Sequence, residues 1–63
     1  MEMKDYKVIL TYEDGSRDVA MVAVADVAAV MMISRGWLST AAGAVSVRYY
    51  QIGDPSLEGC FVR

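Results

Sequence analysis

The sequence predicts a small α+β domain in which one α-helix packs on one face of an antiparallel β-sheet. Three observations support this fold class: two strand patterns joined by an Asp-Gly turn, one helix pattern in the middle of the chain, and further strand patterns after it. The predicted order is ββαβ, or ββαββ if the last segment also forms a strand. A chain of 63 residues forms one domain, covering residues 1–63.

The first predicted strand spans residues 6–12, where the side chains alternate between two faces. Asp14-Gly15 follows it and predicts a two-residue type I′ turn, because both central residues of that turn need positive φ. This turn would pair Tyr12 with Arg17 and would leave Lys7 and Arg17 on opposite faces of the sheet. The expected inner face of the hairpin is then Tyr6, Val8, Leu10, Val19, Met21 and Ala23.

The central helix is predicted over residues 27–35. Asp26 precedes it as an N-cap whose carboxylate can accept from the free N–H groups of the first turn. Gly36 is placed as the left-handed residue that ends the helix, and Trp37 follows it in a position to pack back on Met32. The helix has almost no polar face, so we expect it to be covered on more than one side.

The chain after the helix predicts one strand, a turn and a second, shorter strand. Residues 38–43 form either a loop or one short helical turn. Residues 44–52 form the third strand and residues 57–62 a short fourth strand at an edge of the sheet. The two faces of the third strand carry Val45, Val47 and Tyr49 on one side and Ser46, Arg48 and Tyr50 on the other.

The composition argues against catalysis and against a metal or cofactor. The chain has no histidine, and Cys60 is its only cysteine, so it has no Ser–His or Cys–His pair, no internal disulfide and no ligand set for zinc. The aspartates at positions 14, 26 and 54 have structural roles in turns or the helix cap. We therefore expect a protein that is not an enzyme and binds no cofactor and no metal.

The apolar segments do not predict a membrane protein. Residues 19–33 are the longest apolar stretch, but Asp26 interrupts it and it is shorter than the roughly 20 residues of a membrane span. The charged N-terminus lacks the pattern of a secretory signal, and a single cysteine fits a reducing compartment. We expect a cytoplasmic protein with no membrane partner.

The small acidic chain is expected to bind another protein. Hydrophobic residues make up 56% of the chain, and so small a domain cannot bury all of their side chains alone. Apolar surface that stays exposed usually contacts another protein. The acidic hairpin tip is one candidate partner-binding patch, although a solvated hairpin end is the simpler explanation. The candidate partner-binding residues are Glu13, Asp14 and Asp18 at this tip, with Arg48 and Tyr50 as a second patch.

A homodimer formed through the helix is also expected, because twofold dimers are the commonest oligomers. Ala28, Met32 and Trp37 are the candidate dimer-interface residues. Two other functions remain open. One is a structural or assembly subunit, which the apolar excess fits equally well. The other is a nucleic-acid-binding sheet that uses Arg48 and Tyr50, which the net charge of −2 disfavours.

In size, acidity and lack of catalytic groups, the chain is similar to small inhibitors encoded by phages and mobile elements, including anti-CRISPR proteins and inhibitors of host polymerase. The similarity is one of general character and involves no shared motif. It implies an inhibitor or regulator that docks on a larger macromolecular complex and occupies its surface.

Overall fold

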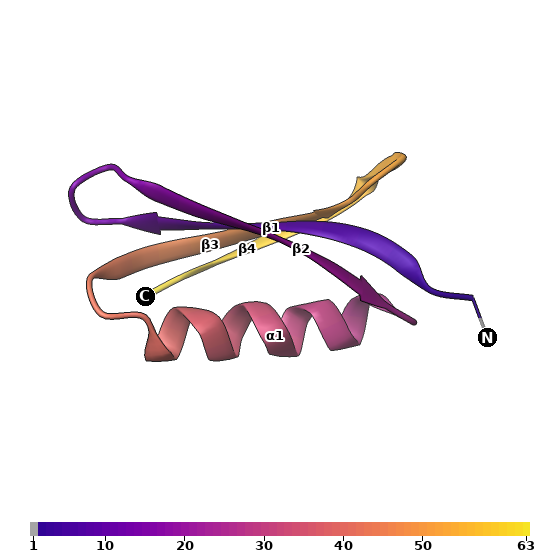
Figure 1. Cartoon of the computed structure of the whole chain (residues 1–63), viewed down its shortest axis with the longest axis horizontal. Helices are drawn as coiled ribbons and strands as arrows, with labels where there is room; N and C mark the ends of the chain where they lie inside the picture. The colour runs from indigo at the N-terminus through magenta and orange to yellow at the C-terminus, as the bar shows by residue number, and fades with distance from the viewer. Residues whose placement is uncertain (1) are drawn as a thin grey trace.

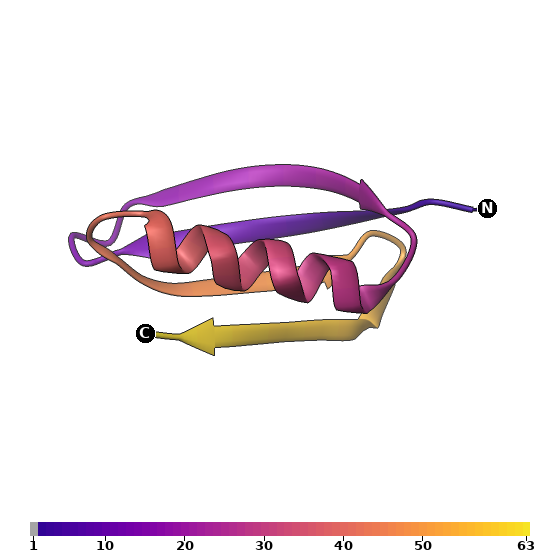
Figure 2. The same cartoon turned by 90° about the horizontal axis from the view of Figure 1, so that it is seen from below.

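A four-stranded antiparallel sheet with one helix against one face accounts for residues 2–63, which the computed structural model describes apart from the side chain of Pro55 (Figure 1). The strands lie in the order β2-β1-β3-β4, so β2 and β4 form the two edges (Figure 2). The predicted fold class is confirmed, and the last segment is a strand. The elements are β1 (Lys4–Tyr12), β2 (Arg17–Val24), α1 (Val27–Thr40), β3 (Ala44–Gln51) and β4 (Asp54–Val62).

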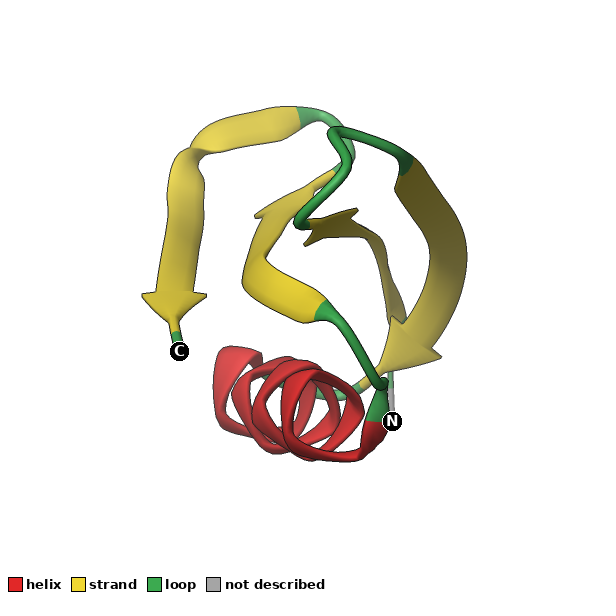
Figure 3. Ribbon diagram, turned by 90° about the vertical axis from the view of Figure 1, so that its left-hand side faces the viewer, coloured by secondary structure: helices red, strands yellow, loops and turns green. Residues whose placement is uncertain are grey.

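The core lies between α1 and the concave face of the curved sheet (Figure 3). The helix packs mainly against β3 and buries a stripe of residues at four-residue spacing. Within this stripe Ser34 is fully buried, and its hydroxyl has no hydrogen-bond partner. The buried apolar residues are Tyr6, Val8, Leu10, Val30, Leu38, Ala44, Val47 and Tyr49. The predicted inner face of β1 is thus confirmed, and of the three residues grouped on one face of β3, Val47 and Tyr49 are buried while Val45 is half-buried.

The hairpin turn between β1 and β2 differs from the predicted type I′ turn. The Tyr12 N–H donates to the Ser16 carbonyl at 2.9 Å, and the Gly15 N–H donates to the Tyr12 carbonyl at 2.9 Å. Of the turn residues only Gly15 has positive φ, at 87°. The loop therefore has three residues and ends in a left-handed glycine, an arrangement that carries a one-residue bulge. Asp14 stabilises it by accepting from the Ser16 N–H and hydroxyl.

The longer loop moves the pairing of β2 by one residue, so the predicted register is wrong. Thr11 pairs with Arg17, and Ile9 pairs with Val19. A shift of one residue reverses both faces of a strand. The half-buried side chains that face the helix are accordingly those of Ala20, Val22 and Val24, while Val19, Met21 and Ala23 are exposed.

The start of the helix follows the prediction, but its end does not. The Asp26 carboxylate accepts from the Ala29 N–H at 3.0 Å, which confirms the N-cap. The helix then continues through Gly36 to Thr40, because Leu38 extends the buried stripe one turn further. Gly36 lacks the predicted positive φ. Trp37 lies inside the helix, half-buried against the core, and not beyond the helix end.

Two segments, residues 38–43 and β4, contain more regular structure than expected. Residues 38–40 are helical, and Gly43, with φ of 81°, turns the chain into β3. Strand β4 begins at Asp54, not at Leu57, and lies at an edge as predicted. Its pairing with β3 is irregular near its start, since Gln51 pairs with Asp54 but Tyr50 pairs with Glu58.

The end of β4 is tied to the helix through Arg63. Its guanidinium group donates to the carbonyl oxygens of Leu38 at 2.6 Å and of Ala44 at 3.1 Å. The first of these carbonyls belongs to the last turn of α1, where acceptors have no partner within the helix. Arg63 therefore connects the helix end to both β3 and β4.

Candidate protein-binding surface

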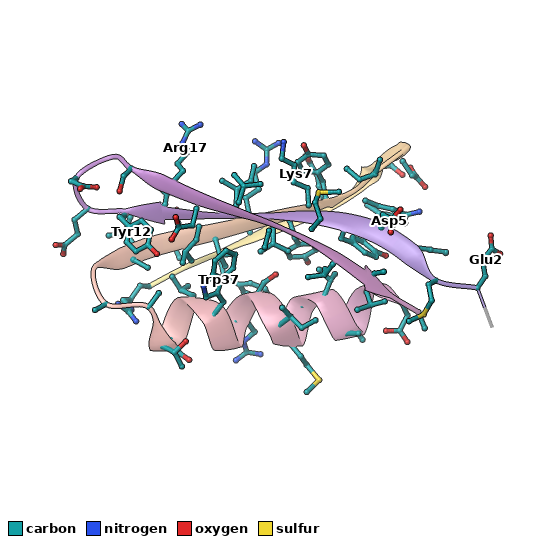
Figure 4. All side chains as sticks on the ribbon, viewed as in Figure 1. Glu2, Asp5, Lys7, Tyr12, Arg17 and Trp37 are labelled. Carbon is teal, nitrogen blue, oxygen red and sulfur yellow. The ribbon has the colours of Figure 1, made fainter. Side chains whose placement is uncertain are left out.

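The sheet has one face that no element of the described residues covers. The helix occupies the concave face, and alternate side chains of all four strands project from the other face, which we call the open face (Figure 4). By strand register, the open face consists of Asp5, Lys7, Ile9 and Thr11 from β1, Arg17, Val19, Met21 and Ala23 from β2, Ser46, Arg48 and Tyr50 from β3, and Glu58, Cys60 and Val62 from β4.

The register arranges these side chains in rows across the strands. Lys7 lies between Met21 and Tyr50 in one row. In the next row Ile9 lies between Val19 and Arg48. Each of these rows therefore brings apolar side chains next to a cation, so that the open face mixes both kinds of group.

Large apolar side chains are well exposed on the open face. The exposed fractions of Val19, Met21 and Val62 are 55%, 59% and 76%. A shallow hollow of about 320 Å³ on the same face is lined in part by Ile9, Cys60 and Val62. Exposed apolar side chains surrounded by polar and charged groups are typical of interaction surfaces.

Three of the six basic residues of the chain lie on the open face. Arg48 donates to the Glu58 carboxylate at 3.0 Å, but both side chains are at least half exposed, so the pair contributes little to stability. Lys7 and Arg17 project away from the helix (Figure 4). The register expected from the sequence placed Arg17 on the other face, so the shift of β2 adds this cation to the surface.

The hairpin tip forms a separate acidic patch. Glu13, Asp14 and Asp18 are all exposed and line one hollow of about 460 Å³ beside Gly43. Asp18 accepts from the Tyr12 hydroxyl at 2.5 Å, and this bond raises the pKa of Tyr12 above its ordinary value. The hydrogen bonds from Ser16 lower the pKa of Asp14. Two of the three acids thus already have structural partners.

The structure does not bring the predicted partner-binding residues into one site. Asp18 pairs with Leu10 and so lies on the helix side of the sheet, whereas Arg48 and Tyr50 lie on the open face. Sequence reasoning missed Val19 and Met21 as surface residues because the expected turn placed them inside. The signal available in the sequence was Ser16 two residues after Asp14, since an Asx bond to that residue favours the longer loop.

The predicted dimer residues divide between two environments. Ala28 is exposed and Met32 is 76% exposed, four residues apart on the outer side of α1. Trp37 is half-buried against the protein's own core. Two residues of the predicted set therefore share an outward-facing surface, while the third contributes to the fold of the monomer.

Comparison with protein-family models, curated proteins and solved structures found no match to this chain. Among residues 2–63, no helix has the length and apolar character needed to cross a membrane. Nor do the described residues include a cluster of three potential metal ligands.

Proposed function

We propose that this protein is a non-enzymatic binding module whose open face docks on a larger protein complex and inhibits or regulates it. The single observation that carries the proposal is the open face itself, on which exposed Val19, Met21 and Val62 lie among cations. Burying such side chains against a partner contributes about 25 cal/mol per Å² of apolar surface removed from water. A rigid domain bound in this way blocks its partner's surface sterically.

The charges on the open face define the chemistry of the partner. Lys7, Arg17 and Arg48 are distributed over three adjacent strands around apolar residues. Complementary interfaces match opposite charges and thereby gain specificity and association rate. The proposed partner surface therefore has an apolar centre and acidic residues around it. We also propose a cytoplasmic location, because a single cysteine that is free and exposed, Cys60, fits a reducing compartment.

Two positions with equal exposure on opposite faces provide the test. Val62 on the open face and Met32 on the helix are each 76% exposed. We expect Val62→Glu to weaken capture of a cross-linked partner at least tenfold, because it adds a negative charge to an apolar contact with an acidic surround. Met32→Glu serves as the matched control and should leave capture unchanged.

Other outcomes of the same experiment contradict the proposal. Equal loss with both variants, or loss with Met32→Glu alone, would place the contact on the helix. Recovery of only the chain itself would favour the assembly-subunit alternative. Both variants must retain the wild-type far-ultraviolet circular dichroism, so that loss of capture is not loss of folding.

Binding of single-stranded nucleic acid is a second candidate, favoured by the placement of Tyr50 among Lys7, Arg17 and Arg48 on one face. Aromatic and basic side chains on an open sheet can stack bases and contact phosphates. Against it, Tyr50 is half-buried and Arg48 is paired with an acid. A steep loss of oligonucleotide affinity with rising salt, removed by Arg17→Glu, would favour this function over protein binding.

A further inference from the structure

The two edges of the sheet differ in how well they are protected against pairing with another strand. The pairing of β4 is interrupted at its start, and Glu58 and Gly59 lie within the strand. Strand β2 pairs with β1 without interruption from Arg17 to Val24 and contains no glycine or proline. Its last six residues are all apolar. A long, regular, apolar edge of this kind is a template for a further strand.

The hydrogen bonds of the hairpin determine which groups of β2 remain free. The Tyr12 N–H points toward β2 and donates to Ser16, whereas the neighbouring Glu13 N–H points toward Gly43. Along a strand, successive residues direct their N–H and C=O groups alternately to one side and to the other. Every second residue of β2 therefore directs these groups away from β1. By this alternation the outward-directed residues are Arg17, Val19, Met21 and Ala23.

We propose that β2 pairs with β2 of a second copy of this chain, antiparallel, about a twofold axis at Ala20. In a continuous sheet, residues opposite each other must lie on the same face, which restricts the symmetric registers to a few. With Ala20 opposite itself, Arg17 faces Ala23 and Val19 faces Met21 of the second copy. This register uses all four outward-directed residues and forms about eight hydrogen bonds.

Charge complementarity supports a second copy as the occupant. In this register Arg17 of one copy lies in the same row as Ala23 and Asp5 of the other, because Asp5 pairs with Ala23 within each hairpin. Their Cα atoms are two strand spacings apart, about 10 Å. Only the small Ala23 lies between the two side chains. The twofold axis therefore creates two Arg17–Asp5 ion pairs between the copies.

The same two residues cannot meet within one copy. Arg17 pairs with Thr11 and Asp5 with Ala23, at opposite ends of the hairpin. The separation of six residues along β1 corresponds to about 20 Å. A charge swap at these positions therefore reports on contact between copies and not on the stability of the monomer. The proposed dimer is compatible with the proposed partner, because the second copy would continue the sheet at the β2 edge and leave the open face uncovered.

Solution mass and a charge swap test the proposal. We expect a mass of twice the 6.9 kDa of the chain by sedimentation equilibrium. Arg17→Glu should raise the dimer dissociation constant roughly tenfold, because two attractive pairs become repulsive. Adding Asp5→Arg to Arg17→Glu should restore it. Arg35→Glu, a charge reversal on the helix, is the control and should have no effect.

Amide hydrogen exchange locates the interface in the wild-type protein. In the dimer the N–H groups of Val19 and Met21 should exchange as slowly as those of Ala20 and Val22, which bond to β1. A monomer at all concentrations from micromolar to millimolar would overturn the proposal. It is equally overturned by a dimer whose Val19 and Met21 amides exchange fast, or by a charge swap that fails to restore association.

Discussion

The same substitution, glycine to alanine, should change stability in opposite directions at Gly36 and at Gly59. A Cβ added at Gly36 would meet no atom within 4 Å. Alanine there should stabilise the helix by about 1 kcal/mol, because glycine costs that much in a helix interior. For a domain of this size the gain corresponds to a melting temperature about 4–8 °C higher.

At Gly59 the space for a side chain is already filled by Tyr49, which lies directly opposite on β3. A Cβ there would be 2.6 Å from Tyr49 Cζ, with the hydroxyl oxygen still closer. Tyr49 is 6% exposed and stacks on Phe61 with ring centroids 6.0 Å apart, so it cannot move away without cost. Overpacking of this kind costs about 1–3 kcal/mol, against about 0.5–1 kcal/mol of backbone entropy that alanine recovers.

With the middle of each range, the net loss at Gly59 is therefore about 1 kcal/mol. A core of this size supplies only about 3–5 kcal/mol. Thermal and urea unfolding of both variants, followed by Trp37 fluorescence at one fixed protein concentration, should show the two opposite shifts. Removing the ring with Tyr49→Leu should abolish the penalty at Gly59. A Gly59→Ala protein as stable as the wild type would refute the packing of Tyr49 over this glycine.

Three other predictions concern polar groups. Ser34→Ala should raise the free energy of unfolding by about 1 kcal/mol, seen as a higher urea midpoint, because it removes a buried hydroxyl that has no partner. A lower free energy of unfolding would mean that the hydroxyl is bonded. Asp26→Ala should cost about 1 kcal/mol and Asp26→Asn much less, since the amide can still accept from Ala29; equal losses would contradict the cap. The pKa of Tyr12 is raised above 10.0 by its bond to Asp18, so any stability from this bond is present below that pH and lost as the pH rises through the folded pKa. Absorbance titration of the tyrosines should show a late step that Tyr12→Phe removes, and its persistence would assign the step elsewhere.

The α+β fold and the inner faces of β1 and β3 were predictable because their alternation is unambiguous. Tyr6, Val8 and Leu10 alternate with residues that include Lys7, and Val47 and Tyr49 alternate with Arg48. Asp26 was recognisable as a cap from its chemistry and position. Each of these predictions required only local sequence.

The register of β2 was not predictable in the same way, because both of its faces are apolar. Val19 and Met21 are as suitable for a core as Ala20 and Val22, so the turn alone decided the face. Asp14-Gly15 is compatible with a two-residue and a three-residue loop. Choosing the shorter loop misplaced the apolar part of the open face.

The helix end was misjudged at Gly36 for a related reason. Glycine at that position satisfies the local rule for a helix end, but tertiary packing of Leu38 outweighs the roughly 1 kcal/mol that a glycine costs inside a helix. The burial of Leu38 beside Ala44 depends on where β3 lies, and local sequence does not contain this information. The candidate site was therefore predictable at Arg48 and Tyr50, but not at Arg17, Val19 and Met21.

The position of the two termini determines how the molecule resists tension. The two ends of the described chain, residues 2 and 63, lie toward opposite ends of a body 37 Å long, and β1 and β4 run in the same direction on either side of β3 (Figure 1). A force applied between the ends acts along the strands, so the hydrogen bonds of β3 to both neighbours are loaded together in shear and are not opened one at a time. We expect single-molecule pulling from the termini to give a higher rupture force than pulling across the strands, and equal forces would contradict this loading geometry.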